Sequence, residues 1–243
     1  MLNKKLLTVA VAATLMSGAG YSVAADDFTI SGNVALTSDY RFRGISQSDE
    51  SAAIQGGFDV EFSPGFYLGT WGSSVDFDSN EVADGSLELD YYGGWKSAIG
   101  DTDFGIDVGY IYYDYPGDNG SPKGDYQEVY VSGSWKDLSV TVNYSDDYYL
   151  ESDTYWRYSA EYSFSLAENL SLGLQAAYNE VEQGGGFFSS DADNYTDYSV
   201  TLTYSVAGVD LSVAYVGTDL DDNDVFGTDW ADDTAVFTIS KSM

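Results

Sequence analysis

The stretch DYSVTLTYSVAGVDLSVAY, from Asp197 to Tyr215, decides the fold. Over 198–206 apolar or aromatic residues alternate with Ser and Thr, and the alternation resumes over 209–215. Strict alternation places one set of side chains on each face of a strand. Only Ala207-Gly208 separates the two runs, which indicates a short turn. The stretch therefore predicts two antiparallel strands, each with an apolar face and a polar face.

The same period of two recurs along the chain after residue 25, where apolar residues rarely recur at the i, i+3, i+4 spacing of a helix. The segments that carry it are 28–42, 54–62, 66–77, 86–96, 103–112, 127–135, 138–144, 156–166, 170–179, 197–206, 209–215 and 234–243. We therefore predict an all-β fold with about twelve strands.

The connections between these segments alternate between short turns and long loops. Short ones include 63–65, 136–137 and 207–208, whereas loops such as 116–125 and 219–232 are long and acidic. This alternation is typical of up-and-down outer-membrane β-barrels. An even number of strands places both termini on the short-turn side, which is the periplasmic side.

Aromatic residues on the apolar parity gather near the strand ends, as in the interfacial belts of membrane proteins. Next to the short turns are Phe28, Phe62, Tyr67, Trp95, Phe104, Trp135, Phe164 and Tyr204. Toward the long loops are Tyr40, Phe77, Tyr112, Tyr144, Trp156, Tyr178, Tyr198 and Tyr215. A soluble β-sandwich also alternates. Two aromatic belts and a hydroxylated, charged polar face favour a transmembrane barrel instead.

Residues 1–25 have the features of a secretory signal peptide. Lys4 and Lys5 precede the apolar run 6–16, and Val23-Ala24-Ala25 offers small residues for cleavage. The run is shorter than the roughly 20 residues of a spanning helix. We expect residues 26–243 to form the barrel. Removal of the segment takes two of nine basic residues and none of 40 acidic ones, which changes the net charge from −31 to −33.

The composition excludes several functions. The chain has no cysteine and no histidine, so thiolate metal sites and His-activated nucleophiles are absent. Nine basic residues among 243 do not provide the basic patch that nucleic acid requires. Carboxylate pairs such as Glu88 with Asp90 offer an acid and a base, but residues two apart on a strand simply share a face. We expect no enzyme activity, no cofactor and no nucleic-acid partner.

Several motifs in the first half of the chain resemble a known family. They are SDYRFRGISQ at 38–47, AIQGGFD at 53–59, GFYLGTW at 65–71, ELDYYGGW at 88–95 and YYDYPG at 112–117. Together they resemble the TorF type of porin-like outer-membrane proteins, also catalogued as the Gcw-chp family. The resemblance implies a barrel and a channel, with no established substrate. Met243 departs from the aromatic residue that usually ends the last strand.

Charged residues on the polar parity are the candidates for a constriction in the bore. Arg41 and Arg43 fall near the extracellular end of the first strand, and Arg157 faces inward on the eighth. The acidic candidates are Asp39, Asp59, Glu61, Glu88, Asp90, Asp107, Glu128 and Glu161. Facing rows of opposite charge tune selectivity. Arginine–carboxylate pairs that brace and plug the lumen are the other interpretation, and the sequence leaves both open.

The function that we expect is passive diffusion of small hydrophilic solutes, with preference for cations because the lumen is acidic. The alternative is a structural or adhesive barrel with a plugged lumen and acidic loops. Outer-membrane lipid and lipopolysaccharide would surround the barrel. The run Asp219–Asp224 lacks the glycine of an EF-hand, so weak Ca²⁺ or Mg²⁺ binding at the acidic loops is all that we expect there.

Overall fold

The computed structural model describes residues 23–24, 28–77, 85–120, 122–182 and 188–243. Most of the predicted signal peptide lies outside this part of the chain. Val23–Ala24 form a two-residue strand, β1, which pairs with Thr29 and Ile30 of β2. Within the described ranges, no helix has the length and apolar character needed to cross a membrane.

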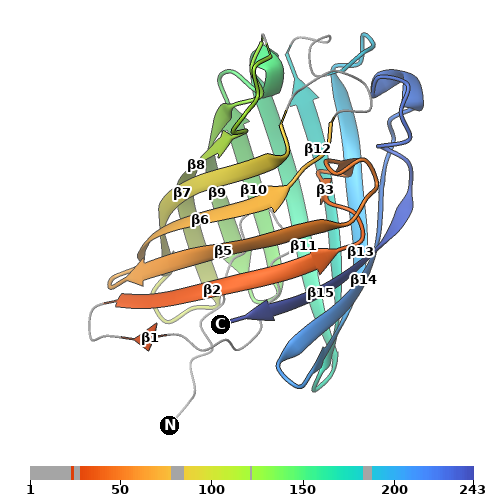
Figure 1. The fold of residues 1–243 in the computed structure, drawn as a ribbon. Helices are drawn as coiled ribbons and strands as arrows, with labels where there is room; N and C mark the ends of the chain where they lie inside the picture. The colour runs from red at the N-terminus through yellow and green to blue at the C-terminus, as the bar shows by residue number, and fades with distance from the viewer. Residues whose placement is uncertain (1–22, 25–27, 78–84, 121, 183–187) are drawn as a thin grey trace.

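Twelve long antiparallel strands form a single closed barrel (Figure 1). Each strand pairs with its neighbours in chain order, and β15 closes the sheet by pairing with β2. The strands are β2 (Phe28–Thr37), β5 (Ala53–Phe62), β6 (Phe66–Ser74), β7 (Leu87–Ala98), β8 (Phe104–Asp114), β9 (Tyr126–Trp135), β10 (Leu138–Ser145), β11 (Tyr155–Ala167), β12 (Leu170–Val181), β13 (Asn194–Val206), β14 (Val209–Thr218) and β15 (Thr234–Ser242). The predicted all-β barrel of twelve strands is confirmed.

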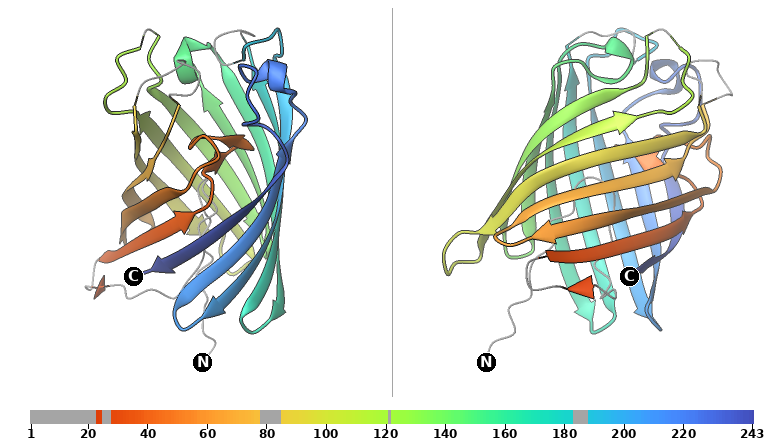
Figure 2. Two further views of the ribbon diagram at one scale, coloured as in Figure 1. Left: turned by 45° about the vertical axis from the view of Figure 1, so that its right-hand side comes forward. Right: turned by 60° about the vertical axis from the view of Figure 1, so that its left-hand side comes forward.

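Short turns gather at one end of the barrel and long loops at the other (Figure 2). Two residues connect β9 to β10, and two connect β13 to β14. Lys136, Ala207 and Gly208 have positive φ angles in these turns. The start of β2 and the C-terminus lie at the short-turn end.

The outer face of the barrel is apolar. Phe58, Leu68 and Phe237 expose 64%, 61% and 60% of their surface. Outward-facing Leu, Val, Ile and aromatic residues continue this belt on every long strand. Soluble monomers rarely expose so large an apolar area, whereas a lipid bilayer covers such a belt around a closed barrel.

Outward aromatic residues form ring pairs near the short turns, as the sequence predicts. Phe28 lies against Phe62, and Phe104 stacks on Trp135. At the opposite end, Tyr144 packs against Trp156.

Three predicted members of the aromatic belts face inward instead. Tyr67 lies on the inner face of β6, because Phe66 and Leu68 take the outward positions. Tyr40 and Phe77 follow the last residues of β2 and β6, and both are buried among the loops. For Tyr40 and Phe77, the period of two continues in the sequence beyond the ends of β2 and β6. For Tyr67, three apolar residues in a row, Phe66 to Leu68, left the parity ambiguous.

One seam of the barrel is shorter than the others. Five residue pairs join β15 to β2, whereas twelve join β11 to β12. Met243 extends the seam, since its backbone both donates to and accepts from Gly32. The last residue of the chain thus takes part in closing the sheet.

The loop between β2 and β5 folds into the bore, and we call residues 38–52 the plug loop. It contains a small hairpin of β3 (Arg41–Phe42) and β4 (Ile45–Ser46). The turn residues Arg43 and Gly44 both have positive φ angles, as a type I′ turn requires. A Cβ on Gly44 would lie 2.3 Å from the methyl group of Thr218 on β14, two strands from β2 around the barrel. The tip residue Arg43 pairs with Glu128 of β9, five strands from β2 around the barrel, so the plug loop reaches across the mouth.

Candidate functional site

The candidate site is the charged lumen and the plug loop that enters it. Most of the predicted acidic residues lie on the inner faces of the long strands: Asp59 and Glu61 on β5, Glu88 and Asp90 on β7, Asp107 on β8, Glu128 on β9 and Glu161 on β11. Glu88, Asp107 and Glu128 each expose only 1% of their surface. All seven of these carboxylates lie on the inward parity of their strands.

Tyrosine hydroxyls bind two of these carboxylates along the wall formed by β5 to β9. Tyr92 donates to Asp59 over 2.6 Å, and Tyr67 donates to Asp107 over 2.7 Å. The Tyr130 hydroxyl also meets that of Tyr67. Hydrogen bonds to a buried carboxylate offset part of its desolvation cost.

Lys96 is a lumen residue that the sequence analysis missed. It forms an ion pair with Glu61 and lies 5.5 Å from the ring centre of Tyr67. Its parity on β7 places it inward, beside the register partner Asp107. Lys96 follows the aromatic residue Trp95 near a short turn. Only the alternation within the strand could have identified it as a lumen residue.

The prediction that places Arg41 and Arg43 on the first barrel strand is wrong. That strand ends at Thr37, and both arginines belong to the hairpin of the plug loop. The hairpin is extended and alternates like a barrel strand, so its sequence continues the pattern of β2. Asp39 also lies in the plug loop and is buried.

Arg43 forms a bidentate ion pair with Glu128 on the barrel wall. Two guanidinium nitrogens each lie 2.7 Å from a different carboxylate oxygen. Asn143 donates to the same carboxylate over 3.1 Å. The guanidinium also lies 4.6 Å from the ring centre of Phe42 and 4.9 Å from that of Tyr155. The hairpin tip is thus fixed to the wall by charge and by cation–π contacts.

Arg41 holds the rest of the plug loop together. Its side chain pairs with Asp39 and lies 2.9 Å from Glu50. It also donates to the backbone oxygens of Trp230 and Asp232 in the loop before β15. Arg41 therefore links two loops that are distant in sequence.

Arg157 lies on the inner face of β11, as predicted, and pairs with Asp197 on β13 at 3.1 Å. Gln175 and Asn179 of β12, the strand between them, each donate to Asp197 over 2.7 Å. Arg157 thus contacts a carboxylate within the wall. Asp197 was missed as a site residue, although parity places it on the polar face.

Tyr40 connects the plug loop to the acidic residues of β7, where its hydroxyl donates to Glu88 over 3.2 Å. Burial raises the pKa of Tyr40 well above its ordinary value, and the charge of Glu88 raises it further. Burial also raises the pKa of Tyr148 to about 12, although Arg43 opposes the shift. Burial alone would lower the pKa of Arg43, but Glu128 raises it well above its usual value. At neutral pH the hydroxyls stay neutral and the guanidinium stays charged.

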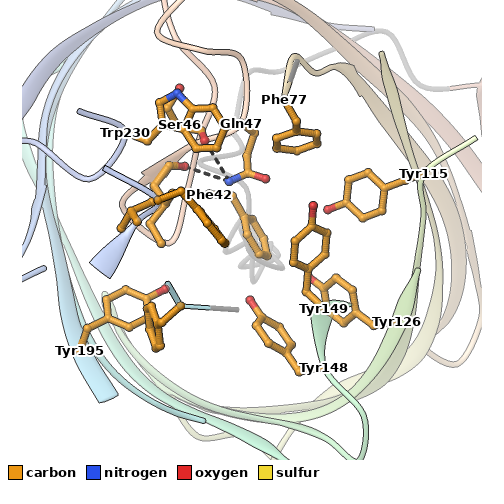
Figure 3. Close-up of a pocket in the computed structure, with 14 residues that line it drawn as sticks. Phe42, Ser46, Gln47, Phe77, Tyr115, Tyr126, Tyr148, Tyr149, Tyr195 and Trp230 are labelled. Atoms are coloured by element: carbon orange, nitrogen blue, oxygen red, sulfur yellow. Dashed lines mark hydrogen bonds between the residues drawn. The ribbon is translucent and has the colours of Figure 1, made fainter. Parts of the chain in front are cut away.

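An aromatic pocket, which we call the mouth pocket, lies beside the plug loop inside the ring of strands (Figure 3). Its lining residues are Phe42, Ile45, Ser46, Gln47, Phe77, Tyr115, Tyr126, Tyr148, Tyr149, Phe188, Tyr195, Val225, Phe226 and Trp230. They come from the long loops and from the starts of β9 and β13, which supply Tyr126 and Tyr195. The sequence analysis missed the pocket, because no local pattern indicates which loops meet at the mouth.

A closed barrel of twelve antiparallel strands, with an apolar outer face and a charged inner face, is the architecture of a porin. The chain belongs to the Gcw_chp family, described as bacterial proteins of unknown function, whose family model matches residues 22–243. The Gcw-chp part of the predicted resemblance is thus confirmed.

Solved structures of porins share the fold. The KdgM porin superposes with a TM-score of 0.56 at 11% identity, over 87% of this chain and 97% of that one. The NanC porin superposes with a TM-score of 0.54 at 13% identity, also over 87% of this chain and 97% of that one. A KdgM porin in complex with disordered oligogalacturonate superposes with a TM-score of 0.54 at 10% identity, over 88% of this chain and 96% of that one. The search of curated proteins gave no match.

Proposed function

We propose that this protein is an outer-membrane channel for passive diffusion of small hydrophilic solutes, and that it prefers cations. The carrying observation is the charge of the described lumen. Ten inward carboxylates among the described residues (Asp39, Asp59, Glu61, Glu88, Asp90, Asp107, Glu128, Glu161, Asp197 and Asp210) face four cations (Arg41, Arg43, Lys96 and Arg157). Fixed charge in a narrow bore attracts ions of opposite sign.

In this proposal the apolar belt contacts outer-membrane lipid and lipopolysaccharide. The short-turn end faces the periplasm, with both termini, and the long loops face outward. Cleavage after residue 25 accompanies export. The long loops carry much of the acidic charge, which supports weak binding of Ca²⁺ or Mg²⁺ at the cell surface.

The charge of the lumen also bears on which class of solute can pass through the channel. Oligogalacturonate, which accompanies one KdgM porin, is a polyanion. Asp59, Glu88, Asp90, Asp107 and Glu161 form no ion pair with a described cation within 4 Å. An excess of acidic groups in a narrow bore disfavours the entry of a polyanion. We therefore expect neutral and cationic solutes to pass in preference.

Planar bilayers test this function. Purified protein should give conductance steps, and a KCl gradient should give a reversal potential of the sign for cation preference. The variant Asp59→Asn/Glu61→Gln removes two lumen charges and should shift that potential toward zero. Tyr204→Phe, on the outer face of β13, is the matched control. Silent bilayers or anion preference would contradict the proposal.

A second candidate is a structural barrel whose lumen is plugged, and the plug loop is the observation that favours it. The ion pairs of Arg41 and Arg43 hold this loop across the mouth. Replacement of residues 39–51 by a short Gly-Ser linker separates the two functions. A channel conducts before the replacement, whereas a structural barrel conducts only after it.

A further inference from the structure

The mouth pocket differs in chemistry from the charged wall of the lumen. Phe42 enters it from the plug loop, whereas Tyr126 and Tyr195 enter it from β9 and β13 (Figure 3). Most of its lining residues are aromatic, and none of the described ones carries a charge. The pocket therefore offers ring faces and edges inside an otherwise acidic barrel.

One polar group in the pocket lacks a partner. Tyr195 exposes only 1% of its surface, and its hydroxyl has no hydrogen-bond partner among the described residues. Figure 3 shows this hydroxyl directed toward the interior of the pocket. Buried polar groups are nearly always hydrogen-bonded, since an unmade bond costs the full desolvation of the group. The hydroxyl is thus available to hydrogen-bond a ligand atom in the pocket.

Gln47 provides a second polar contact. Its amide nitrogen donates to the backbone oxygens of Ile45 and Ser46, over 3.2 and 3.3 Å. These bonds fix the side chain so that its amide oxygen turns toward Phe77 and the pocket (Figure 3). A ligand hydroxyl can donate to such an oxygen.

These features restrict the charge and shape of a ligand. The lining residues offer no ion-pair partner, and the lumen acids repel an anion. Arg43 already occupies the ring faces of Phe42, Tyr148 and Tyr155 and repels a second cation. A sugar bears hydroxyls on most ring carbons, and few polar side chains are present to satisfy them. The chemistry of the lining therefore favours an uncharged aromatic ring with one or two hydroxyls.

We propose that the mouth pocket binds uncharged phenol-type compounds, with the hydroxyl of Tyr195 as the specificity contact. As a solute class for the channel, this inference rests on the proposed function. Binding itself does not depend on conduction, so the two are measured separately.

Calorimetry on the whole protein in nanodiscs tests the site, with empty nanodiscs as the blank. The probes are p-cresol, toluene and glucose. We expect p-cresol to bind more tightly than toluene, and glucose not to bind. Tyr195→Phe should weaken p-cresol binding by roughly threefold to tenfold and leave toluene unchanged, because only one hydrogen bond is lost. Tyr204→Phe, on the same strand but facing outward, should change neither.

Because the Tyr195 hydroxyl has no partner, its removal does not disturb the fold. Val225→Phe adds a ring to the pocket wall and should abolish p-cresol binding. Equal affinity for p-cresol and toluene, an unchanged affinity in Tyr195→Phe, or tight glucose binding would each overturn the proposal. Silent bilayers with p-cresol binding intact contradict the channel alone, whereas conduction without p-cresol binding contradicts the pocket alone.

Discussion

Arg43 brings a positive charge into a part of the barrel from which water is excluded. The guanidinium is stabilised there by Glu128 and by three aromatic rings. A buried ion pair contributes little net stability, but removal of one partner leaves the other charge uncompensated. The pair therefore specifies where the plug loop docks more than it strengthens the barrel.

The variant Arg43→Ala should lower the free energy of unfolding by about 3–5 kcal/mol, because Glu128 is left buried and unpaired. Arg43→Met/Glu128→Gln should recover most of this loss, since neither charge remains. Guanidinium unfolding in micelles, followed by tryptophan fluorescence, measures both. Lys136→Ala, in an exposed turn, is the control. Equal losses in the single and double variants would rule out an uncompensated charge as the cause.

At this scale the sequence predicted which side chains are polar and inward on the long strands, such as Asp107 and Glu128. It could not predict the partners of Arg41 and Arg43. The residues from Asp39 to Arg43 continue the alternation of β2, and a period of two does not reveal where pairing with β5 stops. The contacts with Glu128 and Trp230 depend on the closure of the whole sheet.

At the scale of strands, inward tyrosines lie flat against inward glycines of neighbouring strands. Tyr130 is the register partner of Gly109, and Tyr92 is that of Gly69. A Cβ on Gly109 would lie 2.4 Å from the Tyr130 hydroxyl oxygen, and one on Gly69 would lie 2.3 Å from the Tyr92 ring. Absence of a side chain on each glycine thus leaves room for a ring along the wall.

Gly109→Ala should push the ring of Tyr130 off the wall and lower the single-channel conductance. The double variant Gly109→Ala/Tyr130→Ala should restore it, because no ring remains to be displaced. In Gly133→Ala, a Cβ meets nothing within 4 Å, so the conductance should not change. A normal conductance in Gly109→Ala would show that the ring does not limit the bore.

The short seam between β15 and β2 is the second feature of the strands. A disulfide between Leu36→Cys and Ile239→Cys, which are register partners, should raise the unfolding temperature more than one between Leu172→Cys and Leu202→Cys. The seam has fewer strand hydrogen bonds to begin with, and its cross-link closes a far longer loop. The chain has no cysteine of its own, so each pair is tested cleanly in oxidised and reduced form. Equal shifts would show that the seam is not the weak point.

Strand number and turn lengths followed from the sequence because alternation and turn residues are local signals. The glycine–tyrosine pairs and the short seam did not, since both depend on the register between strands. The sequence around Gly94 and Gly109 does not show that each packs against a tyrosine. Their partners, Tyr67 and Tyr130, lie on neighbouring strands and are identified only by the register.

For the whole molecule, charge is the dominant property. The excess of lumen carboxylates acts through solvent inside the bore, so its range depends on salt. The Debye length falls from about 10 Å at 0.1 M to about 3 Å at 1 M. Cation selectivity, measured by reversal potential, should therefore decrease steeply between these concentrations. Selectivity that is independent of salt would point to direct ion coordination instead.

The plug loop also has a consequence for the order of folding. It begins near residue 38, yet Arg41 and Ser46 bond to the backbone of Trp230, 189 and 184 positions later. Contacts between such distant residues form late, because the chain between them must be ordered first. The plug loop therefore reaches its final position only once the loop before β15 has docked, and the mouth is the last part of the barrel to take its folded shape.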